Sequence, residues 1–264
     1  MLIKSVGTSK MLLNLILLFM FSFQLSGNDV EEKSSASKEN KAFKVGEKLT
    51  FSIGYEFIPA GKTILTVEKI ITIKGKKTYH ISSRTKSHRF FDPFFKVRDE
   101  IDTYMDIDSF RSIKFRKKLR EGRYSYDYSV EFDIDSMKAV SITSKGSRIL
   151  DIPEFTLDIL SAMYYMRTRK LEVGKTLTVD VLDNDKLYPL ELRIIRKERV
   201  VVKAGLFDCF LIEPMLKSGG LFKNEGQISV WVTDDHRKVP VLIKSKAIIG
   251  SIVVELERVE GLIE

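Results

Sequence analysis

The apolar residues of this chain recur with a period of two. In residues 124–132 every even-numbered position is aromatic or aliphatic, and every odd-numbered position is polar. The pattern returns with few breaks at residues 51–57, 65–73, 188–194 and 228–232. Side chains of a β-strand point alternately to opposite faces of a sheet, so this pattern predicts strands with one apolar face and one wet face. Such strands are typical of antiparallel sheets.

Glycine, proline and asparagine separate these runs, as expected of tight turns. About a dozen strands joined by short turns predict a mainly β protein. We expect a curved antiparallel meander or open β-barrel, because the sheet must curl to hide its apolar face; the spacing leaves open whether it is one barrel or two sub-sheets. The predicted turns are Pro59–Gly61, Lys74–Lys76, Glu121–Gly122, Asp183–Asp185, Ala204–Gly205 and Ser218–Gly220.

One segment breaks the rhythm and predicts a helix over residues 155–169. Asp151 is positioned to cap it, Pro153 is tolerated in a first turn, and Glu154 stands three residues after the cap. The apolar residues inside it recur at helical spacing and cover a wide surface. We therefore expect one amphipathic helix packed on the concave face of the sheet. Its apolar positions are Phe155, Leu157, Ile159, Leu160, Met163, Tyr164 and Met166.

The amino-terminal residues have the order of a secretory signal peptide. Two lysines precede an apolar run at residues 11–21, and small residues follow at 25–27. We expect a signal peptide at 1–27, a polar disordered tether at 28–42 and a single β-rich domain at 43–264. This predicts export to the periplasm or outer cell envelope of a Gram-negative-type bacterium, with no transmembrane span after removal of the leader. An uncleaved anchor is the alternative, although the apolar run is shorter than the ~20 residues that span a bilayer.

The formal net charge is +8, but cations and 36 acidic residues are interspersed along the strands. No concentrated basic run with interleaved aromatic residues occurs, so nucleic acid is not an expected partner. The single cysteine, Cys209, is flanked by Phe207 and Phe210 and is best interpreted as a small core residue. No base lies near it in sequence, as a nucleophilic thiol would need.

The residue patterns give little support to catalysis. Two Gly-Lys-Thr triplets, at 61–63 and 174–176, lack the first glycine of a phosphate-binding loop. Asp234, Asp235 and His236 could relay a proton or bind a metal, but such a cluster is more often a polar turn. Glu100 and Asp102 share a strand face, with no second acid to oppose them. We therefore expect no enzyme, no catalytic residues, no metal and no cofactor.

The most unusual stretch is residues 88–96, where four phenylalanines flank an Asp-Pro pair between cations. An aromatic tip of this kind could dip into lipid or close over an apolar ligand. The alternative, which we favour slightly, is a loop folded back onto the barrel mouth to plug its core. The same two interpretations hold for the tyrosines of residues 124–128, which line either the core or a ligand.

Three groups of residues resemble a bacterial exported family designated domain of unknown function 3108. They are Phe43-x-x-Gly46-Glu47-x-Leu49-x-Phe51 with Pro59–Gly61, then Asp158-x-Leu160-Ser161-Ala162-x-Tyr164-Tyr165-x-Arg167, and finally Trp231-x-Thr233-Asp234-Asp235-x-Arg237 with Pro240–Val241. They span nearly all of the predicted domain. The resemblance implies an extracytoplasmic β-rich domain and carries no catalytic residues. The expected architecture is also similar to the open β-barrels of periplasmic lipoprotein carriers, which is an analogy of fold alone.

Three functions are compatible with these patterns. The first is a non-catalytic binding module for an apolar or lipid-linked ligand, with a lipid or lipoprotein-type molecule as its partner. The second is a structural or assembly factor that binds an envelope protein or glycan through its surface. The third, an enzyme acting on envelope polymer, has only the acidic candidates above. The residues predicted to bind a ligand are Phe90, Phe91, Phe94, Phe95, Tyr124, Tyr126, Leu160, Met163 and Tyr164.

Overall fold

In a computed structural model, residues 40–264 form one sheet and one helix; 56–57, 219–220, 224–227 and 247–250 are not described. The predicted leader and most of the predicted tether lie outside the described residues. The strands are β1 (Lys48–Tyr55), β2 (Ile58–Ile73), β3 (Lys76–Ser87), β4 (Arg98–Asp106), β5 (Ser112–Glu121), β6 (Tyr124–Asp133), β7 (Lys138–Thr143), β8 (Gly146–Asp151), β9 (Thr156–Leu157), β10 (Thr176–Asp183), β11 (Lys186–Val202), β12 (Gly205–Ser218), β13 (Leu221–Lys223), β14 (Ile228–Thr233), β15 (Pro240–Lys246) and β16 (Ser251–Glu260). The helix is α2 (Ile159–Arg167).

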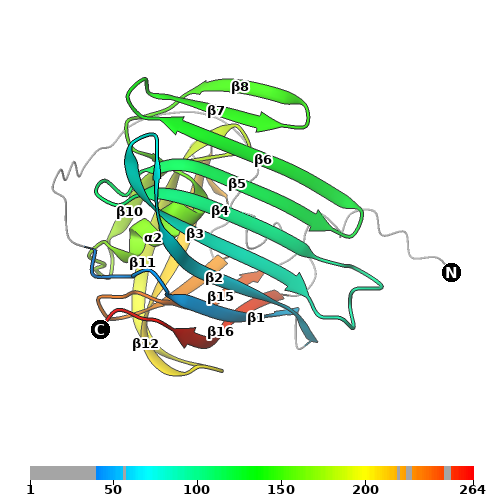
Figure 1. Ribbon diagram of the computed structural model, residues 1–264. Coiled ribbons are helices and arrows are strands. Elements are labelled where there is room, and N and C mark those ends of the chain that lie inside the picture. Colours follow the sequence, from blue (N-terminus) through cyan, green and yellow to red (C-terminus); the bar gives the residue numbers. More distant parts are fainter. Residues whose placement is uncertain (1–39, 56–57, 219–220, 224–227, 247–250) are drawn as a thin grey trace.

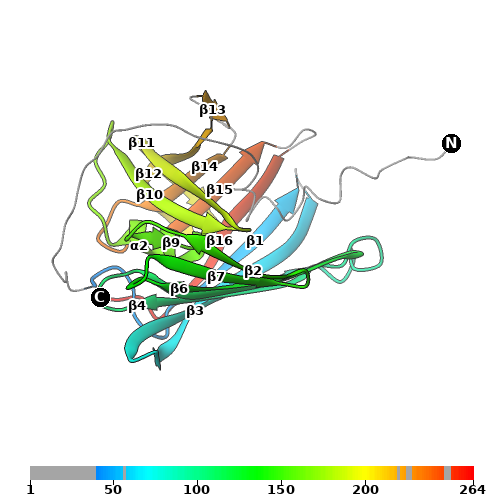
Figure 2. The same cartoon turned by 90° about the horizontal axis from the view of Figure 1, so that it is seen from above.

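The sheet consists of two wings joined at a central seam. The first wing, β1 to β8, runs outward in chain order, and the second wing runs from β16 back to β9. The first and last strands, β1 and β16, pair antiparallel and form the seam. Figure 2 shows the wings facing each other, with α2 between them beside β9 and β10. The prediction of a curved, mainly β meander with a helix inside it is confirmed.

The alternation seen in the sequence places one face of each strand in the interior. In β6, Tyr128, Val130 and Phe132 are buried while their polar neighbours are more exposed. The hairpin between β10 and β11 also forms as predicted, because Asn184 and Asp185 adopt φ of 47° and 62° in the left-handed region that such a turn requires. The period-two pattern thus determines both which face is buried and where the chain reverses.

The predicted turn at Pro59–Gly61 is wrong. These residues lie inside β2 (Figure 1), and Gly61 pairs with both β1 and β3. A Cβ at Gly61 would lie 2.5 Å from the backbone oxygen of Lys86. Glycine is therefore used here for the close approach of two strands, not for a turn.

The predicted start of the helix is also wrong. Asp151 ends β8, and residues 156–157 form the short strand β9, which pairs parallel to β10. The cap is Asp158, whose carboxylate accepts hydrogen bonds from the backbone N–H groups of Leu160 and Ser161. Residues 153–157 are thus not helical, because the pairing of residues 156–157 with β10 replaces the first turn that the Asp-x-Pro-Glu sequence predicts.

The strand register separates two ends of the molecule. The helix end holds α2 and the turn between β14 and β15 at residues 234–239. The aromatic end holds the β3–β4 loop, residues 88–97, and the β5–β6 turn at residues 122–123. Figure 1 shows the β3–β4 loop projecting away from α2. Within the described residues, no helix is long and apolar enough to cross a membrane.

Candidate ligand-binding cleft

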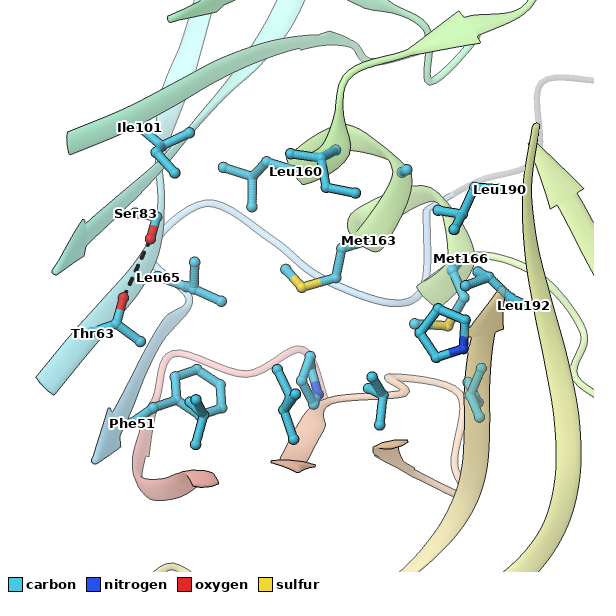
Figure 3. A pocket seen from close by; sticks show the side chains of 18 residues that line it. Phe51, Thr63, Leu65, Ser83, Ile101, Leu160, Met163, Met166, Leu190 and Leu192 are labelled. Carbon is cyan, nitrogen blue, oxygen red and sulfur yellow. Dashed lines mark hydrogen bonds between the residues drawn. The ribbon is translucent and has the colours of Figure 1, made fainter. Parts of the chain in front are cut away.

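A cavity of about 150 Å³, partly open to solvent, lies between α2 and the inner faces of both wings (Figure 3). This is the size of an engineered apolar cavity that stays dry and binds benzene. Its walls are almost entirely aliphatic or aromatic. The lining residues are Phe51, Thr63, Leu65, Ser83, Ile101, Ile159, Leu160, Ala162, Met163, Met166, Leu190, Leu192, Ile212, Pro214, Val230, Pro240, Ile243 and Val254.

The helix divides its apolar surface between the two halves of the core. Leu160 and Tyr164 pack in the cluster that contains the first wing and the seam. Ala162 and Met166 pack in a second cluster with β10, β11 and β12. Met163 packs against the first cluster and points into the cavity in Figure 3. Residues of both clusters border the cavity, among them the flexible methionines Met163 and Met166.

Asp158 holds the amino-terminal end of the helix against the first wing. Its fully buried carboxylate accepts hydrogen bonds from the hydroxyls of Thr103 and Ser112, both at 2.6 Å, and of Ser161 at 2.7 Å. Burial raises the pKa of this carboxyl, and the hydrogen bonds oppose that rise. With its two backbone donors, Asp158 connects α2, β4 and β5 in one satisfied network.

Arg167 holds the other end of the helix through a buried ion pair. Its guanidinium donates to both carboxylate oxygens of Glu47, at 2.7 and 2.8 Å, and to the backbone oxygens of Ala42 and Arg237. Arg167 and Glu47 have no exposed side-chain surface. The pair therefore ties the segment before β1 to the helix and to the β14–β15 turn, and it brings the three groups of family-like residues together.

A second buried ion pair joins the two wings directly. Lys117 Nζ on β5 lies 2.7 Å from both carboxylate oxygens of Asp183 at the tip of β10. Burial raises the pKa of Asp183, while the Lys117 ammonium lowers it. The lysine also lies over the rings of Tyr126 and Tyr128. This contact links the wings on the side opposite the seam and fixes their separation.

A row of polar side chains leads away from the cavity along the first wing. Thr63 and Ser83 line the cavity with their hydroxyls 3.3 Å apart, as Figure 3 shows, and Thr85 donates to Thr63 at 2.8 Å. Thr85 lies directly opposite Asp99 in the β3–β4 pairing. Glu121 of β5 lies opposite Val97, two residues before Asp99, and the charge of Asp99 raises the pKa of its carboxyl. We call Thr63, Ser83, Thr85, Asp99 and Glu121 the polar row.

Two of the ligand-binding residues predicted from sequence line the cavity, Leu160 and Met163. Tyr164 does not: its ring packs edge-on against Phe43 and lies under Arg167, which makes it part of the helix anchor. Tyr124 and Tyr126 stack in a ladder with Tyr128 on β6, outside the cavity lining.

The four phenylalanines of the β3–β4 loop lie outside the cavity lining and divide into two pairs. Phe90 and Phe94 are 75% and 79% exposed, whereas Phe91 and Phe95 are partly buried. Phe95 packs against Gly122 of the β5–β6 turn. Arg98 and Ser87 hydrogen-bond to Asp92 and hold its pKa below the usual range. An ordered loop thus presents two aromatic rings to solvent.

Two of the acidic candidates for catalysis, Asp235 and Asp102, are hydrogen-bonded to neighbouring groups. Asp235 accepts hydrogen bonds from Thr233, from the backbone of Arg237 and from that of Lys238, as a turn residue does. Asp102, on the outer face of β4, pairs with His80 at 2.8 Å and Arg84 at 2.6 Å. Burial alone would raise the pKa of Asp102, but these bonds outweigh it and lower it.

The single cysteine, Cys209, is a buried free thiol. Burial raises the pKa of Cys209 to about 12, which keeps it protonated. Among the described residues, no three His, Cys, Asp or Glu side chains lie close enough together to hold a metal ion.

A family model described as a protein of unknown function, DUF3108, matches residues 50–257. The chain belongs to this family. No curated protein matches it by sequence. A β-barrel-like protein of the domain of unknown function DUF1849 from Brucella abortus has a similar structure, with a TM-score of 0.54 and 10% identity over 83% of this chain and 99% of that one. This likeness concerns the fold of the chain alone.

Two further solved structures align over a similar length with lower scores. One is a lipoprotein candidate from Parabacteroides distasonis, with a TM-score of 0.36 and 10% identity over 84% of this chain and 100% of that one. The other is a candidate exported protein with a YmcC-like fold from Bacteroides fragilis, with a TM-score of 0.36 and 11% identity over 83% of this chain and 99% of that one.

Proposed function

We propose that this DUF3108 protein is an exported, non-catalytic binding module of the bacterial cell envelope that holds an apolar or lipid-linked ligand between its wings. The observation that carries the proposal is the cleft itself. Small-molecule sites are concave and mostly apolar, with a few placed polar groups. The cleft has that composition, with Thr63 and Ser83 as its only polar lining residues in the described part of the chain.

The buried ion pairs support a preformed site. Arg167–Glu47 and Lys117–Asp183 fix the helix and the two wings around the cavity. Separating the partners of such a pair leaves uncompensated buried charges, so each pair favours the arrangement in which its two partners stay in contact. A preformed apolar site spares the ligand the cost of ordering its walls.

Native mass spectrometry with lipid extraction tests this function on the full chain exported to, and recovered from, a bacterial periplasm. We expect a stoichiometric non-covalent mass in the lipid range. Ile243→Trp, which fills the cavity from β15, should lose that mass. Val201→Trp is the matched control, since Val201 is 78% exposed on β11.

The absence of any added ligand mass on all three proteins, together with no affinity for any alkyl probe, would refute the proposed function. Circular dichroism of the three proteins shows whether Ile243→Trp keeps the fold, so that loss of ligand is not mistaken for unfolding.

The exposed pair Phe90 and Phe94 favours a second candidate, a structural or assembly factor that binds an envelope protein or glycan. Exposed aromatic rings on an ordered loop mark contact surfaces. In this case the Phe90→Ser/Phe94→Ser variant should lose a co-purifying partner while its stability changes little. Retention of every partner by the variant would remove this candidate.

A further inference from the structure

The polar row ends in two carboxylates that are not fully paired. Asp99 Oδ1 accepts a hydrogen bond from the backbone N–H of Arg120 at 2.7 Å. Asp99 Oδ2 and Glu121 Oε1 are buried and have no partner among the described residues. The two side chains are only 3% and 2% exposed. Burial of a carboxylate oxygen without a hydrogen-bond donor costs free energy of folding. Asp99 and Glu121 can therefore each accept a further hydrogen bond.

The position of these carboxylates relates them to the cleft. Asp99 lies two residues from Ile101 on β4, and Ile101 lines the cavity, so the two side chains share the inner face. The hydroxyls of Thr63 and Thr85 continue this polar surface back to the cavity wall. A molecule that fills the cavity therefore meets apolar walls beside α2 and the hydroxyls of Thr63 and Ser83. The polar row leads from these hydroxyls to the buried carboxylates.

The cleft offers no counter-charge to an anion. None of the 18 lining residues is charged. The buried cation on the same inner face, Lys117, is already bound to both oxygens of Asp183. Burial raises the pKa of both Asp99 and Glu121 to about 7, and the charge of Asp99 contributes to the rise at Glu121. At pH 8 the row thus carries negative charge that a donor would stabilise and an anion would not.

We propose that the cleft selects amphiphiles whose polar end donates hydrogen bonds and carries no negative charge, such as an alcohol or a primary ammonium. The alkyl chain lies beside Leu160 and Met163, and the polar end lies on the polar row near Asp99 and Glu121. This proposal rests on the proposed function, because it assigns a ligand class to the same cleft.

Competition for a fluorescent alkyl probe at pH 8 tests the selection with four ligands of equal chain length: decanol, decylammonium, decanoate and decyl sulfate. We expect decanol and decylammonium to bind at least about ten-fold more tightly than the two anions, since an unpaired charge must be desolvated. In Asp99→Asn/Glu121→Gln, decylammonium should lose about ten-fold and decanoate should gain. Asp208→Asn, an exposed carboxylate on β12, is the control and should change nothing.

The outcomes distinguish the selection for the polar end of the ligand from the proposed function of the cleft. Equal binding of decanol and decanoate to the wild type, or an unchanged preference in the double variant, would overturn the selection and leave an apolar-ligand cleft. No binding of any of the four would overturn both the selection and the proposed function. If the double variant fails to fold, the comparison of the four ligands on the wild type still tests the selection.

Discussion

The two ends of the molecule treat buried charge in opposite ways. At the helix end, Glu47 and Arg167 are completely enclosed and satisfy each other with two short hydrogen bonds. Towards the aromatic end, Asp99 and Glu121 are almost as deeply buried, yet each keeps an oxygen without a partner among the described residues. Because the fold pairs its buried charges completely at the helix end, the unpaired carboxylate oxygens of Asp99 and Glu121 indicate a role besides stability.

The largest expected effect belongs to the helix end. Arg167→Met leaves the Glu47 carboxylate buried and unpaired, so we expect the free energy of unfolding to fall by about 3–5 kcal/mol. Urea denaturation followed by circular dichroism measures it. Lys138→Met, which removes an exposed ion pair with Asp151, should cost less than about 1 kcal/mol. Equal effects would show that the buried pair is not an anchor.

Removal of the helix cap should have the next largest effect. Asp158→Ala deletes the carboxylate that accepts hydrogen bonds from two backbone N–H groups and three hydroxyls. The buried hydroxyls of Thr103 and Ser112 then lose this acceptor. We expect a loss of about 2–4 kcal/mol, measured by the same denaturation. A loss below about 1 kcal/mol would contradict the role assigned to this network.

At the aromatic end, ionisation of Asp99 and Glu121 should lower the stability of the folded state. The folded pKa values of Asp99 and Glu121, both about 7, exceed the ordinary values of 3.8 and 4.5. The folded state therefore binds more protons than the unfolded state between these limits, and their contribution to stability is lost as pH rises from about 4 through about 7. Glu121→Gln should weaken this loss, which makes the variant less sensitive to pH than the wild type.

Thermal or urea unfolding at pH 5 and pH 8 measures that difference. The matched control is Asp208→Asn, because its carboxylate is exposed and should leave the pH dependence unchanged. The same change in stability between pH 5 and pH 8 in the wild type and in Glu121→Gln would contradict the raised pKa of Glu121.

The smallest effect is expected at the loop tip. Phe90→Ser and Phe94→Ser should each change the free energy of unfolding by less than about 0.5 kcal/mol, since both rings are exposed. Phe95→Ser should cost clearly more, because its ring packs on Gly122. Equal costs for all three would show that the loop is part of the core rather than a presented surface.

The sequence predicts local structure well where periodicity decides it. The strands, the curled meander and the inner position of the helix all follow from the period of two and its single interruption. The helix start could not be predicted, because the pairing of residues 156–157 with β10 depends on a contact between segments that are distant in sequence.

The site could be predicted only in part, for the same reason. Leu160 and Met163 are found from helical spacing. The polar row was missed, although a signal existed: Asp99 and Glu121 stand at inward positions of their strands, in phase with Ile101 and Leu119. Charged residues at such positions can mark either an ion pair, as Lys117 does, or an unpaired site. Only the three-dimensional pairing distinguishes these cases.

A crystal structure of the full exported chain grown with 10-bromo-1-decanol tests the central claim most directly. The anomalous signal locates the bromine at the end of the alkyl chain. The account predicts bromine beside Leu160 and Met163, with the hydroxyl on the polar row near Thr63 and Asp99. Bromine bound only at Phe90 and Phe94 or elsewhere on the surface, with the cleft unoccupied, would contradict it.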